Sequence, residues 1–210
     1  MLHEQIILEL EMIPKVKTAD IEKIAKQYLK DGVDVSVLKP YIEKHYAIFR
    51  IYFVVSLKRI KDYKLQTKFI EDHQHYFNDW WHIDLLLQLL VKAPSFEYVF
   101  AKAKHYLASP LLFMRRWGYV IFLSGFQKNP DYTKDILSLY KNDEEYYVHM
   151  GAAWLLADLC IYNSEEVLTF IAAKKVDYKI IGKGIQKICD SLRISEEVKN
   201  KAKALRVLYK

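Results

Sequence analysis

The stretch Asn78-Asp79-Trp80-Trp81-His82-Ile83-Asp84-Leu85-Leu86 begins the helix that decides how this chain folds. Short polar side chains such as Asn78 and Asp79 favour the position just before a helix, and the leucines that follow predict an apolar helix starting near Trp80. Residues four apart share a helical face, so Trp80 and Asp84 are expected to point to the same side. A carboxylate among Leu and Ile is costly unless it meets a cation, a donor or solvent.

The rest of the chain continues this helical pattern. Apolar residues recur at intervals of three and four, only six glycines and five prolines interrupt them, and no Asn-Gly hairpin signal occurs. We therefore predict an all-α fold in one domain over residues 1–210, with a first helix that stops before Pro14 and a second that begins at a Thr18 cap. The predicted helices cover residues 2–12, 18–31, 37–45, 47–62, 66–76, 80–92, 96–107, 111–123, 130–140, 144–162, 165–173, 178–191 and 196–208.

Three helices in the second part of the chain begin in a similar way. They start near Trp80, Leu111 and Glu144, about 30 to 35 residues apart, and each opens with aromatic or charged residues before it becomes apolar. This spacing predicts a helical-repeat solenoid of antiparallel helix pairs, whose inner helices line a concave groove. A helical bundle is the alternative architecture.

Several classes of protein are disfavoured by composition. The apolar stretches are shorter than about 18 residues or carry charges, so we predict no membrane span. The N-terminus resembles no signal peptide, and Cys160 and Cys189 form no ligand motif, which favours a cytoplasmic protein without structural zinc. On a helix, His73 and His75 would point about 200° apart, which disfavours a metal site. We expect a monomer with no metal and no cofactor.

The charge of the chain is unevenly distributed. Residues 173–210 carry eleven Lys and Arg against four Asp and Glu, a net charge of +7, whereas the whole chain carries +6. Lys175, Lys179, Lys183 and Lys187 recur every four residues, and those within the helix predicted from Tyr178 are expected to form one basic stripe. This asymmetry favours a surface that binds a polyanion, with a solvated basic tail as the alternative.

Polar and aromatic clusters occupy comparable places in the three units that begin near Trp80, Leu111 and Glu144. If these units stack, their clusters would align along one groove; each alone is also compatible with a structural role, because most tryptophans lie in cores and arginines often reach solvent over apolar surface. The clusters are Trp80-Trp81 with Asp84, Phe113-Met114-Arg115-Arg116-Trp117, and Glu144-Glu145-Tyr146-Tyr147 with Trp154.

These clusters resemble the motifs of the AlkD-like DNA glycosylases, a family built of HEAT-like helical repeats. That family has Trp-x-x-x-Asp in one repeat, an Arg in an apolar aromatic context in the next, and a Trp inside an apolar helix in the third. The matching positions are Trp80 with Asp84, Arg116 and Trp154. Residues 32–39, Gly-Val-Asp-Val-Ser-Val-Leu-Lys, are similar to a further family segment. The resemblance covers most of the chain.

The resemblance implies a metal-free glycosylase that removes N3- or N7-alkylated purines from duplex DNA by hydrolysing the N-glycosidic bond, acting on a lesion left in the duplex. A cationic purine leaves readily, so the carboxylate of Asp84 needs to stabilise an oxocarbenium-like sugar and to place water. Trp80 and Trp154 can pack on the deoxyribose and the cationic base. Arg116 suits the phosphate beside the lesion.

DNA contacts elsewhere are expected from Arg115 and the basic stripe. No lysine lies beside Asp84 in the motif to form a Schiff base, so we expect a monofunctional enzyme.

Two departures from the family pattern leave alternatives open. The N-terminal part is shortened around Lys30-Asp31-Gly32, and the family's basic residue three positions after the third-repeat tryptophan is Ala157. One alternative is therefore a helical-repeat protein that binds DNA without turnover. The other is a protein-interaction solenoid whose groove holds a peptide.

Overall fold

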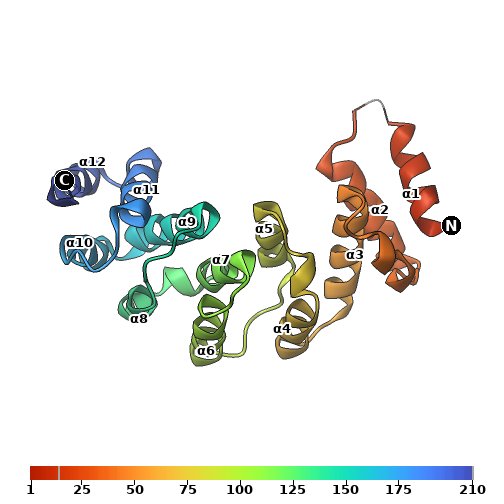
Figure 1. Ribbon diagram of the computed structural model, residues 1–210, viewed down its shortest axis with the longest axis horizontal. Coiled ribbons are helices and arrows are strands. Elements are labelled where there is room, and N and C mark those ends of the chain that lie inside the picture. The colour runs from red at the N-terminus through yellow and green to blue at the C-terminus, as the bar shows by residue number, and fades with distance from the viewer. Residues whose placement is uncertain (14, 210) are drawn as a thin grey trace. The chain divides into compact units, whose positions relative to one another are not determined.

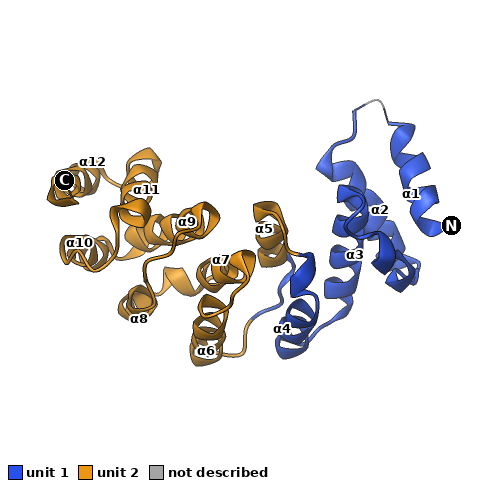
Figure 2. Ribbon diagram, in the orientation of Figure 1, with its two compact units in different colours: residues 1–76, 89–92 blue, residues 77–88, 93–210 orange. Residues whose placement is uncertain are grey.

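The computed structural model describes residues 1–13 and 15–209 and divides the chain into two compact units (Figure 1 and Figure 2). Unit 1 comprises residues 1–76 and 89–92, and unit 2 comprises residues 77–88 and 93–210. Helices make up the regular secondary structure of the described ranges, which contain no strand, so the predicted all-α fold is confirmed. The stop predicted before Pro14 falls on a residue outside those ranges. The single domain predicted over residues 1–210 stays a prediction.

Unit 1 is built around one helix that is buried on almost every side. Ten of the fourteen residues of α3 are buried, and α3 packs against α2. Arg50 of α3 is one of these buried residues, and its guanidinium donates to the Glu22 carboxylate of α2 at 2.6 Å. The helices of this unit are α1 (Leu2–Glu11), α2 (Thr18–Lys30), η1 (Ser36–Tyr41), α3 (Tyr46–Arg59), α4 (Tyr63–Asp72) and η2 (Gln74–Tyr76).

Two predictions for unit 1 are wrong in detail. The helix expected over residues 37–45 is the shorter 3₁₀ helix η1, which contains Pro40, a residue that cannot donate the backbone hydrogen bond of a continuing α-helix. The N-cap of α2 is Lys17 rather than Thr18, and the Lys17 backbone N–H donates to the side chain of Asp20 at 2.9 Å. Thr18 shares a hydrogen bond with the hydroxyl of Tyr46 at 3.0 Å instead.

Unit 2 contains the candidate site and is organised around α9. This helix is mostly buried and packs against α7, α10 and α11, as Figure 1 shows. A Cβ atom on Gly184 of α11 would lie 2.5 Å from a methyl group of Leu156 of α9, so the glycine is what lets these two helices approach closely. The helices are α5 (Trp80–Leu89, of which Leu89 belongs to unit 1), α6 (Phe96–Leu107), α7 (Leu112–Val120), η3 (Ile121–Ser124), η4 (Phe126–Lys128), η5 (Pro130–Tyr132), α8 (Thr133–Ser138), α9 (Tyr146–Tyr162), α10 (Ser164–Ala172), α11 (Tyr178–Asp190), α12 (Glu196–Leu205) and η6 (Arg206–Tyr209).

Helix α5 starts at Trp80 as predicted but ends at Leu89, three residues before the predicted end. The cause is the fully buried side chain of Gln66. Its amide nitrogen donates to the Leu89 carbonyl at 3.1 Å, and its amide oxygen accepts from the Val91 N–H at 2.8 Å. These bonds replace the ones that another helical turn would have made.

The helices of unit 2 otherwise follow the predictions within a few residues, with 3₁₀ turns at some ends. The segments predicted as single helices over residues 111–123 and 130–140 are each divided between an α-helix and a 3₁₀ helix. No helix among the described residues is long and apolar enough to cross a membrane.

Candidate active site

One cavity of unit 2 brings the three sequence clusters together. It measures about 280 Å³ and is lined by side chains from α5, α7, α9 and α11. All four residues predicted to form the catalytic site lie in its wall. The lining residues are Trp80, Asp84, Arg116, Tyr146, Tyr147, Met150, Trp154 and Lys187.

Asp84 and Arg116 form an ion pair in this cavity. A terminal nitrogen of the Arg116 guanidinium, Nη2, donates to Asp84 Oδ1 at 2.8 Å, and the other, Nη1, donates to the Tyr147 carbonyl at 3.0 Å. The Arg116 side chain is 5% exposed and that of Asp84 is 23% exposed. The arginine is therefore enclosed by the protein, while the carboxylate keeps an accessible edge. Within the described part of the chain, Asp84 Oδ2 accepts no hydrogen bond.

A glycine on α9 makes room for this arginine. A Cβ atom on Gly151 would lie 3.1 Å from Arg116 Cγ, which is tighter than most real contacts, and 3.5 Å from its Nη1, an ordinary contact. Glycine in the middle of a helix costs about 1 kcal/mol relative to alanine, so its place here fits a packing requirement. Gly151 lets the Arg116 side chain run along α9 to reach both the Tyr147 carbonyl and Asp84.

Aromatic side chains surround the accessible edge of the carboxylate. Trp80 is 46% exposed although it is a large apolar residue, and Tyr146 and Tyr147 are also exposed. Trp154 is half-buried in the same wall. Exposed rings next to a carboxylate form a surface that favours a flat, cationic ligand, because the faces of aromatic rings carry partial negative charge.

His82 helps to fix the start of α5. Its ring nitrogen Nδ1 accepts a hydrogen bond from the Asn78 backbone N–H at 3.3 Å, and Asp79 Oδ1 accepts from the Trp80 N–H at 2.7 Å. Burial lowers the pKa of His82 from 6.5 to about 4, so the imidazole is neutral near pH 7 and able to accept this bond. Both residues proposed as the N-cap thus lie at the turn that presents Trp80.

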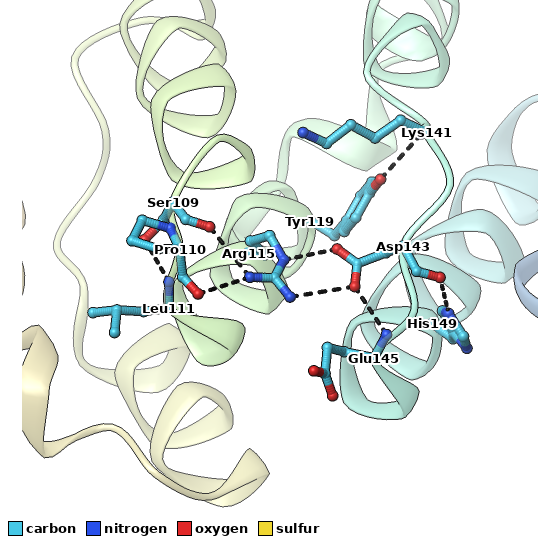
Figure 3. A network of polar contacts seen from close by, with 9 residues as sticks. All are labelled: Ser109, Pro110, Leu111, Arg115, Tyr119, Lys141, Asp143, Glu145 and His149. Atoms are coloured by element: carbon cyan, nitrogen blue, oxygen red, sulfur yellow. Dashed lines mark hydrogen bonds and ion pairs between the residues drawn. The ribbon is translucent and has the colours of Figure 1, made fainter.

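Arg115, the neighbour of Arg116, holds the segment that leads into α9 (Figure 3). Its Nε donates to Asp143 Oδ2 at 2.7 Å, and its Nη1 donates to the carbonyls of Ser109 and Pro110 at 3.2 and 3.0 Å. Burial alone would raise the pKa of Asp143, but its bonds to Arg115 and to the Glu145 N–H hold that pKa below the usual value. Arg115 therefore connects the segment before α7, which contains Ser109 and Pro110, to Asp143 in the segment before α9.

The same network continues into α9. Tyr119 accepts a hydrogen bond from the Lys141 backbone N–H at 3.3 Å, and His149 Nε2 lies 2.6 Å from the Asp143 carbonyl, to which it must donate because a carbonyl only accepts (Figure 3). These contacts anchor the first turns of α9, which carry Tyr146, Tyr147 and Met150. The Arg115 network is thus a support for the cavity wall rather than part of it.

The basic stripe predicted on the C-terminal part is divided among different cavities. Lys187 lies in the wall of the candidate site, while Lys179 and Lys183 line an adjoining cavity over α9 and α11. Lys175 precedes α11 and lines another cavity with Lys134 and Glu166, over α8 and α10. The stripe therefore begins at Lys179, where the helix begins.

Sequence reasoning missed some contributors to the site. It did not predict Met150, the packing role of Gly151, or the Arg115–Asp143 bridge, and it placed Lys187 on a general DNA surface rather than in the cavity. The glycine in the apolar sequence of α9 was a usable signal, because such a position usually marks a close approach. The others depend on how α7, α9 and α11 pack.

The fold and site define a class of protein: an all-α protein whose packed helices present an ion-paired carboxylate in an aromatic cavity. The family model described as DNA alkylation repair enzyme matches residues 15–182, and the chain belongs to that family. The resemblance to AlkD-like proteins noted from the motifs is thereby confirmed. Searches of curated proteins and of solved structures gave no match. The matched range contains Trp80, Asp84, Arg116 and Trp154.

Proposed function

We propose that this protein is a DNA glycosylase that removes N3- and N7-alkylated purines from duplex DNA by hydrolysing the N-glycosidic bond. Membership of the DNA alkylation repair family supports alkylated DNA as the substrate, and the residues of the cavity support the reaction. The observation that carries the proposal is the Asp84 carboxylate, fixed by Arg116 at 2.8 Å and open on its other side to a wall of exposed rings.

The proposed chemistry needs little from the protein beyond this constellation. An alkylated purine with a formal positive charge departs as a neutral base, so no strong acid is required. Positive charge then develops on the deoxyribose, and the carboxylate of Asp84 stabilises it and orients a water for attack at the anomeric carbon. Trp80 and Trp154 would hold the sugar and the cationic base against the carboxylate. With water as the nucleophile, the product is an abasic site.

In this proposal Arg116 holds Asp84 rather than a phosphate. Both terminal nitrogens of its guanidinium already have protein acceptors, and its side chain is almost enclosed. A fixed carboxylate is worth more to catalysis than a mobile one, because it needs no reorganisation as charge develops. The phosphate beside the lesion would instead meet Lys187, the cation of the cavity wall that has no acidic partner within the described residues.

The DNA surface proposed around the site is a groove of repeat helices with cations from α11. Lys179, Lys183 and Lys187 contribute the sequence-independent attraction to phosphates. Lys175 is left out because it lines the separate cavity over α8 and α10. Arg115 supports the groove indirectly, because its nitrogens bind Asp143 and two backbone carbonyls.

A second candidate function is DNA binding without turnover. It is favoured by Ala157, which is buried on α9 at the position where the family has a basic residue. The retained Asp84–Arg116 pair favours turnover, because a protein that only binds a polyanion gains nothing from a carboxylate in its groove.

The test is incubation of the protein with methylated duplex DNA, with chromatography of the released bases. Release of free 3-methyladenine or 7-methylguanine, absent from a mock incubation, supports the glycosylase. If the protein binds duplex DNA in a salt-dependent way but releases no base, the second candidate function replaces the first. If it binds no duplex at all, both are overturned and a protein-interaction role takes their place.

A further inference from the structure

A second cleft adjoins the candidate site. It measures about 500 Å³ and lies over the start of α9, the first turns of α11 and the C-terminal η6. Tyr146 lines both this cleft and the candidate site, so its side chain lies between the two. The charged residues of its wall are Glu144, Lys179, Lys183 and Arg206, a net charge of +2 when His149 is neutral.

Exposed aromatic side chains concentrate around these two cavities. Within residues 1–13 and 15–209, the large aromatic side chains that are exposed to solvent are Tyr46, Trp80, Tyr146, Tyr147 and Tyr178. All but Tyr46 line the candidate site or the second cleft. Exposed rings on a basic surface are typical of nucleic-acid grooves, where they pack against sugars and bases between phosphate contacts.

Two of the cations are held in place by these rings. Lys183 Nζ lies 4.6 Å from the centre of the Tyr146 ring, and the Arg206 guanidinium lies 5.7 Å from the centre of the Tyr178 ring. Arg206 Nε also donates to the Tyr178 hydroxyl oxygen. Neither cation has a carboxylate partner among the described residues. Long side chains held in this way lose less conformational entropy when an anion arrives.

The third cation of the cleft, Lys179, already has a carboxylate partner. Lys179 forms an ion pair with the Glu144 carboxylate at 2.5 Å, and this contact raises the pKa of the lysine and lowers that of the glutamate. An incoming phosphate would have to compete with Glu144 for Lys179. The free positive charge of the cleft therefore comes from Lys183 and Arg206.

We propose that the second cleft binds a backbone phosphate of DNA that flanks the lesion, with Lys183 and Arg206 as its donors and Tyr146 separating it from the candidate site. This inference rests on the proposed function for the position of the lesion. It assigns DNA contacts to a part of the chain beyond the family match, which ends at residue 182. Where the family's basic residue on α9 is replaced by Ala157, the cations come from α11 and the C-terminal turn.

The test is a scan of single neutral phosphates. Duplexes carry a tetrahydrofuran abasic analogue at a fixed position and one methylphosphonate at successive flanking positions, and their affinities are measured for the wild type and for Lys183→Ala with Arg206→Ala. The double variant should bind the unmodified duplex about ten-fold more weakly, because it loses two cations. One or two methylphosphonate positions should weaken the wild type and leave the double variant unaffected. Lys203→Ala, at an exposed lysine of α12 outside the cleft, is the control for the loss of one cation and is compared with Lys183→Ala alone as well as with the double variant.

Glu144→Gln supplies a test with the opposite sign. It releases Lys179 and removes a carboxylate, so it should tighten binding to the duplex several-fold. The proposal is overturned if the double variant binds like Lys203→Ala, or if every methylphosphonate position weakens wild type and double variant equally. It is also overturned if an acidic peptide, rather than DNA, binds the wild type and loses affinity in the double variant. If Arg206→Ala unfolds the C-terminal turn, Lys183→Ala alone and Arg206→Lys carry the comparison.

The outcomes separate this inference from the proposed function. Binding to the abasic analogue requires no turnover, so the phosphate pattern can appear in a protein that releases no base. In that case the cleft assignment stands and the glycosylase proposal fails. If the wild type releases base, but the same methylphosphonate positions weaken the wild type and the double variant, the glycosylase proposal stands and the cleft assignment fails.

Discussion

Each unit has a polar cluster among buried side chains, and the two clusters differ in whether their hydrogen bonds are complete. In unit 1, the buried amide of Gln66 donates to the carbonyls of Leu57, Ile60 and Leu89 and accepts from Val91. In unit 2, Arg116 donates to one oxygen of Asp84, and the other oxygen accepts no hydrogen bond from a described residue. A closed network stabilises the fold, whereas an open one leaves an acceptor for a ligand.

The aromatic residues of the two units show the same difference. Tyr52 of α3 shares a hydrogen bond with His73 Nε2 at 2.9 Å, the His73 ring stacks on Phe69 with centres 4.0 Å apart, and its Nδ1 lies 2.8 Å from the Phe69 carbonyl. Tyr52 and His73 are buried. In unit 2, Trp80 and Tyr146 are exposed at the rim of the cavity. The two units show that open hydrogen-bond acceptors and exposed rings indicate a functional cluster better than the types of residue it contains.

The largest expected effect comes from Asp84→Asn. We expect base release from methylated duplex to fall by about 10²- to 10³-fold, because the substitution removes the charge assigned to the transition state. Duplex affinity should stay within a few-fold, since removing a carboxylate from the proposed DNA-binding surface does not weaken binding by charge. The measurement is single-turnover base release with duplex affinity in parallel, and Asp190→Asn, exposed at the end of α11, is the matched control.

The same variant also tests whether Asp84 is only structural. Its loss leaves the enclosed Arg116 without a counter-charge, so a loss of stability is expected as well. Near-normal turnover in a folded Asp84→Asn protein would remove Asp84 from the reaction. If the variant is unfolded at the assay temperature, the Asp84–Arg116 ion pair is a structural contact, like the hydrogen bonds of Gln66 in unit 1.

For the closed network, Gln66→Leu should lower the free energy of unfolding by about 3 kcal/mol. Leucine nearly preserves the volume, but it leaves three carbonyls and one N–H without their buried partner. Urea denaturation measures the effect, and base release per folded molecule should stay within two-fold of the wild type. Gln88→Leu, an exposed glutamine of α5, is the control. A Gln66→Leu protein that keeps its stability but loses base release would contradict the distinction between a structural Gln66 network and a functional Asp84 site.

Protonation of His82, which accepts a hydrogen bond at the start of α5, is expected to lower the free energy of unfolding at acidic pH. Its pKa of about 4 in the folded protein is lower than the 6.5 expected in the unfolded chain, so the unfolded state binds the proton first as the pH falls. The contribution of His82 is therefore fully present above pH 6.5 and is lost between pH 6.5 and 4, amounting to at most about 3 kcal/mol.

Urea denaturation of the wild type and of His82→Asn across this pH range measures the effect. The asparagine Oδ1 retains an acceptor for the Asn78 N–H, so the variant should lose stability less steeply on acidification. His75→Asn, whose ring is exposed, should follow the wild type. Parallel curves for wild type and His82→Asn would show that His82 is not the group that titrates.

The smallest expected effect distinguishes Lys187 of the basic stripe from Lys175, which lies outside it. Lys187→Ala should reduce the slope of log affinity against log salt by about 0.9, the value for one lost phosphate contact. Lys175→Ala should leave the slope unchanged, because Lys175 lies over α8 and α10 rather than beside the candidate site. The measurement is affinity for one undamaged duplex over a salt series. Equally reduced slopes for the two variants would place Lys175 on the DNA surface, as the sequence predicted for it.

The sequence alone was sufficient for the all-α class and the family, and it named four of the residues that line the candidate site. Helical periodicity is local, so α6 appeared with its observed bounds, Phe96–Leu107, and α5 with its observed first residue, Trp80. The spacing of Trp80 and Asp84 also fixed their common face, because four residues make about one helical turn. Helix ends were less accurate where a distant side chain decided them, as Gln66 does at Leu89.

Only the tertiary structure decided what each charged residue does. Arg115 and Arg116 are neighbours on α7 and equally basic in sequence, yet one holds Asp143 and the other holds Asp84. Lys187 is 103 positions from Asp84, and it enters the same cavity because Gly184 lets α11 approach α9. The physical reason is that a side chain's role depends on its partners in space, and long-range packing selects those partners after local propensity has formed the helices.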